Sequence, residues 1–141
     1  METQVFDADG TWVCPPGVTS VQAECVGGAS SGSARAQSPS NAGGAGGGGG
    51  AYAKTLSIPV TPGVTYNVKV GLGGAAPPAG ENRGNAGAAS WFTTTGSFPT
   101  STAEGCMAQG AAVCANVNTG AIGGLAGTSV GDVKTSGSNG G

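Results

Sequence analysis

Residues 51–70 read AYAKTLSIPVTPGVTYNVKV, and this stretch decides the fold class. Large side chains alternate with smaller or polar ones over 52–58 and again over 64–70. An alternation with period 2 is typical of a half-buried β-strand. Thr61-Pro62-Gly63 separates the two runs and is a strong turn signal. The stretch therefore predicts a β-hairpin with a loop of about four residues.

The same period continues on both sides of this hairpin. Residues 18–26, VTSVQAECV, alternate cleanly and predict a strand after the turn Pro15-Pro16-Gly17. Shorter strands are predicted at 3–7, 11–14 and 88–95, with a second hairpin formed by 98–107 and 111–117 and one more strand at 129–134.

No segment carries apolar residues at the spacing of a helix, so the fold class is all-β. The large apolar residues suffice for one small antiparallel β-sandwich with long glycine-rich loops. This predicted core consists of Val5, Phe6, Trp12, Val21, Val26, Tyr52, Leu56, Ile58, Tyr66, Val68, Val70, Trp91, Phe92 and Phe98. The sandwich domain is expected over 1–119, and 120–141 is expected to be a glycine/serine-rich tail or a final strand plus linker. The chain ends at SNGG with no closing strand predicted after it, which leaves open a fragment or a tail.

Glycine-rich insertions interrupt the sandwich at 27–50 and 71–87. Glycine supplies 30 of 141 residues, where an average protein has roughly 7%. Two states are open for these tracts: a flexible loop, or an extended array resembling polyproline II that packs against like segments. In the second state glycine is required because the chains approach more closely than a Cβ permits. The predicted assembly tract is Gly43, Gly44, Gly46, Gly47, Gly48, Gly49 and Gly50.

The charge distribution argues against several classes of partner. Charged residues make up 9% of the chain, the net charge is −2, and the five basic residues are scattered. No basic stripe is present that could neutralise nucleic-acid phosphates, and no apolar run is long enough to span a membrane. The opening METQVFDADG carries no Sec-type signal peptide.

Four cysteines, Cys14, Cys25, Cys106 and Cys114, show neither a C-x-x-C motif nor the spacing of a zinc site. Cys106 and Cys114 flank MAQGAAV, and a turn near Gly110 would bring them opposite each other as a disulfide. A small buried thiol is the alternative at each position.

Catalytic constellations are missing from the sequence. The chain has no histidine to activate a serine or cysteine, and only Asp7 and Asp9 lie close together among the acids. We therefore expect neither an enzyme nor a cofactor or metal site. Trp12 and Trp91 lie among apolar residues, which favours core packing, but an exposed Trp91 beside Asn85 is the first candidate for stacking on a sugar.

Read in series, these motifs resemble a known family. The order runs from DGTWVCPPGVTSVQAECVGG through GGGGGAYAKTLSIPVTPGVTYNVKVGLGG. It resembles the glycine-rich domain of phage tail and virion structural proteins and of related bacterial surface proteins, over residues 3 to about 92. The resemblance implies a small β-sandwich with glycine-rich loops, attached to tails, fibres or adhesins, and no catalytic residues.

Three functions follow as expectations. The first is a structural component of a phage tail, fibre or virion surface that contributes to host attachment. Its expected partners are copies of itself as a homo-oligomer or other virion proteins, and its expected location is the virion surface or another extracellular site. The second is a subunit of a bacterial extracellular filament or surface layer. The third is a carbohydrate-binding module at a fibre tip, with a cell-surface glycan as partner.

Overall fold

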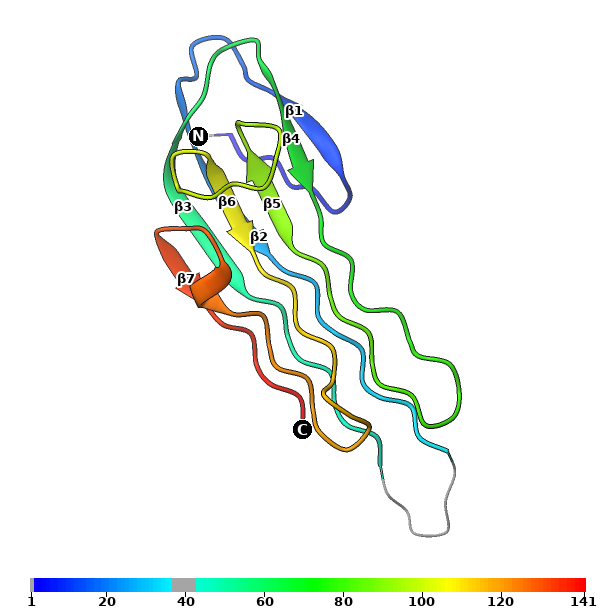
Figure 1. Ribbon diagram of the computed structural model, residues 1–141. Helices are drawn as coiled ribbons and strands as arrows, with labels where there is room; N and C mark the ends of the chain where they lie inside the picture. The colour runs from blue at the N-terminus through cyan, green and yellow to red at the C-terminus, as the bar shows by residue number, and fades with distance from the viewer. Residues whose placement is uncertain (1, 37–42) are drawn as a thin grey trace.

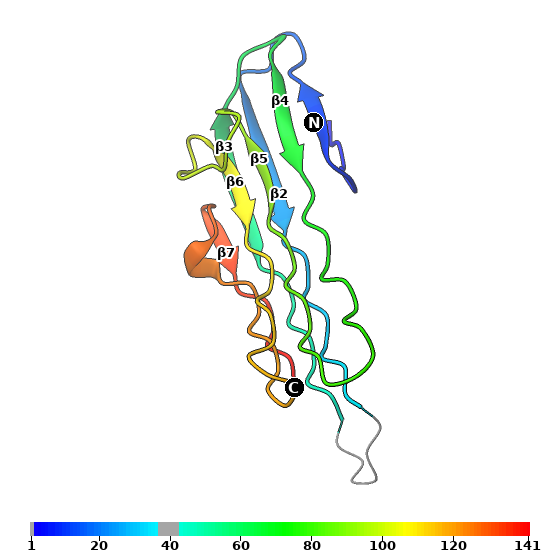
Figure 2. The same ribbon diagram turned by 45° about the vertical axis from the view of Figure 1, so that its right-hand side comes forward.

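The protein is a small β-sandwich from which extended chain segments run out side by side, as Figures 1 and 2 show. The computed structural model describes residues 2–36 and 43–141. Its strands are β1 (Gly10–Val13), β2 (Ser20–Val26), β3 (Tyr52–Pro59), β4 (Thr65–Lys69), β5 (Ser90–Thr93), β6 (Gly105–Ala108) and β7 (Val133–Thr135), with one short 3-10 helix, η1 (Ala126–Thr128). The all-β prediction is confirmed.

Two antiparallel sheets form the sandwich. One has the strand order β1-β4-β5-β6, and the other has the order β2-β3-β7. The register places Trp12 opposite Tyr66 and Phe92 opposite Cys106 in the first sheet, and Cys25 opposite Ala53 in the second. The predicted small antiparallel β-sandwich is therefore the observed architecture.

An aromatic cluster fills the space between the sheets. The ring centroids of Trp12, Tyr66 and Phe92 lie 5.9–6.1 Å from one another. Ile58 is fully buried beside them, and the Tyr66 hydroxyl accepts a hydrogen bond from the Thr61 backbone N–H at 2.8 Å. This cluster, together with Val21 and Val68 packed against the core, is the part of the predicted core that the structure confirms.

The predicted hairpin of 52–70 does not form as a pair of strands. β3 pairs with β2 and β7, whereas β4 pairs with β1 and β5, so the two strands belong to different sheets. The turn itself is present: the Val64 N–H donates to the Thr61 carbonyl, and Gly63 has φ +78°. The chain turns at the predicted place but crosses from one sheet to the other there.

A β-bulge changes which side of β3 faces the core. Between Val21 and Ala23 of β2 the register on β3 moves from Ile58 to Thr55, so β3 carries one extra residue. Because side chains alternate with period 2, the extra residue reverses the faces on its two sides. Ile58 is fully buried, whereas Leu56 is 55% exposed, which corrects its place in the predicted core.

Other predictions about strands and core are also corrected. The core prediction is wrong for Val5, Val26 and Phe98, whose side chains are exposed. Residues 3–7 form no strand, and residues 111–117 do not pair with 98–107 because β6 takes β5 as its partner. In the last predicted strand, 129–134, Val130 bridges to Met107 and β7 begins at Val133.

The extended region, here called the glycine bundle, is made of residues 27–34, 43–51, 71–75, 82–89, 109–117, 118–124 and 137–141. Its segments run side by side away from the sandwich in both ribbon views. None of them is a β-strand or a helix apart from single bridges. Residues 120–141 are predicted as a tail or a final strand plus linker. In the structure they supply β7 to the sandwich, and most of segment 118–124 and all of segment 137–141 to the bundle.

Hydrogen bonds between bundle segments recur at every third residue. The N–H groups of Gly27, Ser30 and Ser33 donate to the carbonyls of Ala51, Gly48 and Ala45. A neighbouring pair of segments repeats the spacing, with Gly28, Ser31 and Ala34 donating to Ala88, Asn85 and Asn82. A period of 3 residues per turn is that of polyproline II, which has no hydrogen bonds within one chain. In the bundle segments, the second predicted state of the glycine tracts is therefore the observed one, while residues 37–42 of the predicted insertion 27–50 lie outside the described residues.

Candidate functional site

The interior of the glycine bundle contains backbone where other proteins have side chains. At many bundle glycines, a Cβ would lie under 3.0 Å from a carbonyl oxygen of a neighbouring segment, a separation that real Cβ atoms essentially never show. These glycines are Gly27, Gly28, Gly44, Gly47, Gly50, Gly71, Gly74, Gly84, Gly87, Gly110, Gly120, Gly123, Gly124, Gly137 and Gly140. Any other residue there would push two backbones apart.

The predicted assembly tract lies near the middle of this arrangement. Gly44, Gly47 and Gly50 face the carbonyls of Ser33, Ser30 and Gly27, and the Gly46 and Gly49 N–H groups donate to Gly141 and Ser138. Gly48 lies against Gly123, whereas a Cβ on Gly43 would meet nothing within 4 Å. The close approach that the sequence predicts is present, and the neighbours in this structure are segments of the same chain.

Short side chains complete the bundle's hydrogen bonding. The Gly48 N–H donates to Ser30 Oγ at 2.8 Å, and the Ser33 hydroxyl donates to the Val117 carbonyl at 2.9 Å. The Cys114 thiol lies 3.7 Å from the carbonyls of Ser31 and Gly46. Ser30 Oγ therefore accepts where a backbone carbonyl otherwise would, and the Ser33 hydroxyl and the Cys114 thiol add donors without widening the bundle.

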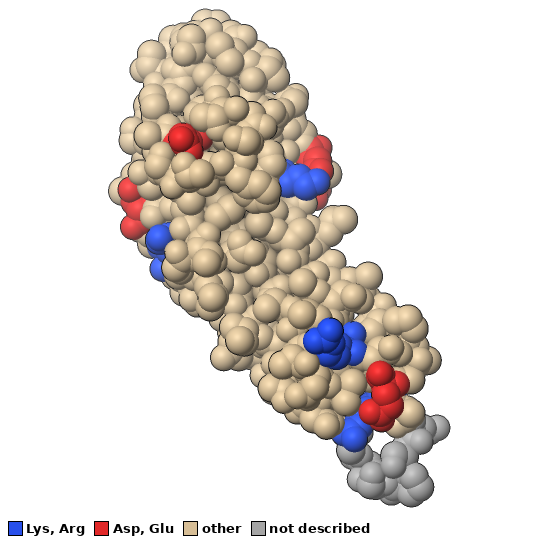
Figure 3. Space-filling view, in the orientation of Figure 1, with Lys and Arg blue, Asp and Glu red and all other residues tan. Residues whose placement is uncertain are grey.

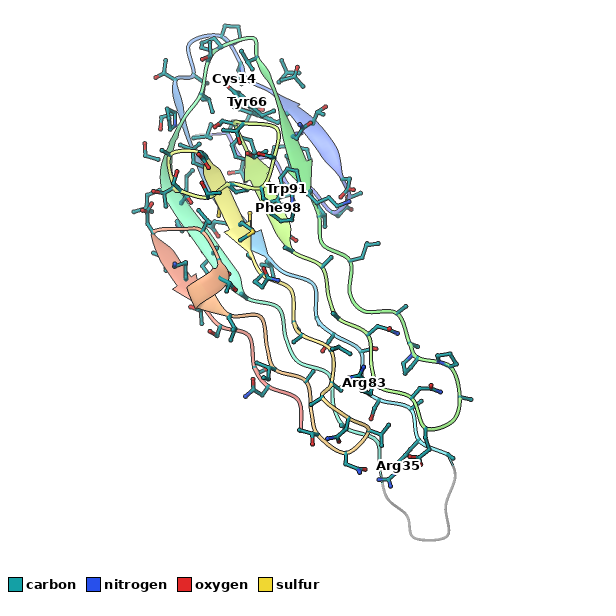
Figure 4. All side chains as sticks on the ribbon, viewed as in Figure 1. Cys14, Arg35, Tyr66, Arg83, Trp91 and Phe98 are labelled. Carbon is teal, nitrogen blue, oxygen red and sulfur yellow. The ribbon has the colours of Figure 1, made fainter. Side chains whose placement is uncertain are left out.

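The two residues proposed for glycan contact lie in different parts of the molecule. Trp91 is half-buried in β5, and its ring packs against exposed Phe98 with a centroid distance of 5.4 Å (Figure 4). Asn85 lies in the glycine bundle, where its side-chain amide donates to the Ala75 carbonyl at 2.8 Å. Phe98, which the sequence places in the core, is thus the exposed aromatic neighbour of Trp91, and Asn85 is not.

The predicted disulfide between Cys106 and Cys114 is not formed. All four cysteines are buried free thiols. Gly110 makes no turn, since Ala108 pairs with Ser90 and Ala111 donates to Gly28 in the bundle. Cys106 faces Cys25 instead, whereas Cys114 lies among bundle segments. The alternative of a small buried thiol describes each position in this structure.

Two open depressions lie on the sandwich. One, of 1240 Å³, runs between the inner side of β1 and β4 and the edge of β2, and Trp12, Val21 and Val68 are among its apolar lining residues. The other, of 220 Å³, is lined by residues that include Asp7, Asp9, Lys69 and Leu72. The close acid pair Asp7 and Asp9 lies at this second depression.

The charged side chains are few, and half of them form three ion pairs. Lys69 pairs with Asp9, Lys54 with Glu24 at 3.1 Å, and Arg35 with Glu81 at 3.5 Å. Figure 3 shows wide surface between them without charged side chains. The hydrogen bond from Lys69 lowers the pKa of Asp9, and that from Lys54 lowers the pKa of Glu24. In the described part of the chain, no helix is both long and apolar enough to cross a membrane.

The spacing of the glycines carries a signal for the bundle that their composition alone does not. The glycines that cannot carry a Cβ recur at intervals of three, as in 44, 47 and 50, in 71 and 74, in 84 and 87, in 120 and 123, and in 137 and 140. Extra glycines between them hide the period, above all in 43–50. Counting the glycines at period 3 would have predicted a polyproline II bundle rather than left two states open.

Comparison with known proteins identifies one family. No curated protein and no solved structure matches the chain. A family model described as a glycine-rich domain matches residues 4–141, which extends through the last third, beyond the resemblance to about residue 92. The chain belongs to this family of glycine-rich domains.

Proposed function

We propose that the chain is a non-enzymatic structural module on the outside of a phage tail, fibre or other virion surface, where it contributes to host attachment. The observation that carries the proposal is the glycine bundle. It projects from the sandwich as an extended array whose segments are held by regular backbone hydrogen bonds. Such an array suits a spacer that holds one part of a particle at a distance from another.

The geometry of the bundle supports a stiff spacer. A segment of eight residues at about 3.1 Å per residue gives roughly 25 Å of projection beyond the sandwich. The central segment 43–51 is hydrogen-bonded to several others, including 27–34 and 137–141. Bending would have to break bonds between several neighbours together.

Exposed apolar side chains on the surface support assembly with other structural subunits. Leu72, Val113 and Ile122 are exposed large apolar side chains on the bundle, and Leu56 and Val133 are exposed on the outer side of the second sheet. Apolar side chains gain free energy when a neighbouring subunit covers them. We therefore propose a homo-oligomer or a repeating assembly with other particle proteins.

A subunit of a bacterial extracellular filament or surface layer is the second candidate, because the same bundle and apolar surface suit it. The two differ in what the assembly does. A filament subunit polymerises by itself into long structures. A tail or fibre module forms a closed oligomer, which then attaches to its particle.

The test combines electron microscopy with a surface variant. Negative-stain images and light scattering of the purified chain are expected to show a closed oligomer, and the exposed Ile122→Lys should shift it to monomer. Thr65→Lys adds the same charge at an exposed β4 position and should leave the assembly unchanged. Long filaments would favour the second candidate, and a monomeric wild-type chain would contradict self-assembly.

One observation favours the third candidate, glycan binding. Phe98 is 54% exposed and packs on half-buried Trp91, next to Lys69 in the strand register, and aromatic faces beside polar groups can bind sugars. A glycan array probed with the wild-type chain tests it. Binding should be lost in Phe98→Ala and kept in Leu56→Ala, which removes a comparably exposed side chain elsewhere. No bound glycan, or equal loss in both variants, would contradict it.

A further inference from the structure

The two sheets meet at a pair of thiols far apart in the sequence. Cys25 lies in β2 and Cys106 in β6, and both side chains belong to the hydrophobic core. The Cys25 thiol donates to the Cys106 carbonyl at 3.6 Å, so its sulfur lies against the Cys106 backbone. β2 and β6 belong to different sheets, so this contact crosses the interior of the sandwich.

The backbone around the pair holds it in place. Thr55 of β3, which is fully buried, donates from Oγ1 to the Gly105 carbonyl at 2.9 Å. Phe92 pairs with Cys106 across β5 and β6, and Ala53 pairs with Cys25 across β2 and β3. Each cysteine is therefore held by a strand partner, and both side chains lie in the core between the sheets.

The other two cysteines are placed differently. Cys14 lies near the end of the sandwich distant from the bundle (Figure 4), and its thiol donates to the Val18 carbonyl at 3.2 Å. Cys114 lies in the bundle beside Ser31 and Gly46. Among the four cysteines, Cys25 and Cys106 are thus the pair in which the thiol of one contacts the backbone of the other.

We propose that Cys25 and Cys106 are the site of a disulfide that joins the two sheets when the chain folds in the presence of a low-molecular-weight disulfide such as oxidised glutathione. Disulfides need Cβ atoms within about 3.5–4.5 Å, and the contact of the Cys25 sulfur with the Cys106 carbonyl brings the two side chains toward that geometry. The proposal does not depend on the proposed function. It pairs Cys106 with Cys25, whereas the sequence offered Cys114 as the possible partner of Cys106.

The reaction balances in two exchange steps. The thiolate of one cysteine attacks a sulfur of oxidised glutathione, forms a mixed disulfide and releases one glutathione. The second cysteine, as a thiolate, then attacks the protein sulfur of that mixed disulfide and releases the other glutathione. The two protein thiols lose two electrons and two protons, which the two released glutathione molecules carry. Because the folded pair is buried, the exchange takes place during folding, before the sheets close.

The sequence allows the link to be mapped without ambiguity. A protease that cleaves after glutamate and cyanogen bromide, which cleaves after methionine, put the cysteines on separate fragments. Cys14 lies in 3–24, Cys25 in 25–81, Cys106 in 105–107 and Cys114 in 108–141. Each pairing therefore gives a different cross-linked mass.

The experiment refolds the full chain in oxidised or in reduced glutathione, alkylates it under denaturing conditions and maps the fragments. After oxidative folding we expect two alkylated cysteines, a mass lower by two hydrogen atoms before alkylation, and fragment 25–81 linked to 105–107. The oxidised chain should melt roughly 10 °C higher than the reduced chain.

Variants supply the control. Cys14→Ser should keep the link, and Cys25→Ser should lose both the link and the difference in melting temperature. Four alkylated cysteines after oxidative folding, or a link between 105–107 and 108–141, would overturn the proposal. The wild-type mapping decides the question alone if a variant fails to fold.

Discussion

Gly47 shows what one methyl group costs inside the bundle. Its Cβ would lie against the Ser30 carbonyl, which belongs to a neighbouring segment and is held there by the bundle's hydrogen bonds. We expect Gly47→Ala to reduce the free energy of unfolding by about 3 kcal/mol, because the two backbones must separate. Urea unfolding monitored by tryptophan fluorescence measures it.

Gly43→Ala is the matched control at the residue scale. It lies in the same tract, but its Cβ would meet nothing within 4 Å. Its stability should change by about 0.5 kcal/mol or less, or rise slightly because alanine restricts the unfolded chain. Equal losses in the two variants would mean that the tract is not packed as described.

Strand β3 is the clearest case at the scale of the element. Ile58 is fully buried and Leu56 is exposed, although the simple alternation puts both on one face. Ile58→Ala should cost about 2–5 kcal/mol and Leu56→Ala less than about 0.5 kcal/mol in the same unfolding assay. A large cost at Leu56 would indicate that β3 has no bulge.

Sequence patterns predicted where the strands and turns of the sandwich lie better than which strands pair with each other. The turns at Pro15-Pro16-Gly17 and Thr61-Pro62-Gly63 are present, each with a glycine at positive φ, because the signal is local. β3 and β4 follow each other closely yet belong to different sheets, since pairing depends on which distant strands offer complementary faces. The bulge and the Cys25–Cys106 contact are likewise decided by distant segments.

At the scale of the whole molecule, glycine composition predicted close backbone packing but not which segments pack against each other. The reason is that a tract of glycines has no side chains to specify which segment it contacts. Similarly, the sequence named Trp91 as an aromatic candidate but placed Phe98 in the core. Nothing in the local pattern shows that the loop carrying Phe98 turns back over β5.

Hydrogen exchange should reveal the bundle in solution. The N–H groups of Ala45, Gly46, Gly49 and Ala51 are donors to other segments, so they should exchange more slowly than a free glycine tract by orders of magnitude. The bundle's own contribution to the far-UV circular dichroism should nevertheless resemble that of an unfolded chain, because polyproline II is a major conformer of unfolded chains as well. Rapid exchange throughout 45–51 in native buffer would contradict the bundle.

Acid should weaken the fold through a few carboxylates. The pKa values of Asp9, Glu24 and Glu104 are lowered, by hydrogen bonds from Lys69, from Lys54 and from the Thr100 backbone. Their stabilising effect is present above the ordinary values of 3.8 and 4.5 and is lost as the pH falls through the lower folded values.

Melting temperature measured from pH 7 to 2 should therefore fall modestly below about pH 4.5. Glu104→Gln should flatten part of this decrease, whereas Glu2→Gln, at an exposed residue near the N-terminus, should not change it. A melting temperature that rises on acidification would contradict the sign.

Most bundle segments continue directly from a strand: 27–34 follows β2, 43–51 leads into β3, 71–75 follows β4, 82–89 leads into β5 and 109–117 follows β6. A glycine segment has no means of finding its own register, so the sheets must align it. Folding should therefore proceed in one direction: the sandwich forms first as the nucleus, and the hydrogen bonds of the bundle then form progressively outward from it. Length could then change during evolution by whole turns of three residues, added across all segments together, without altering the sandwich that starts the process.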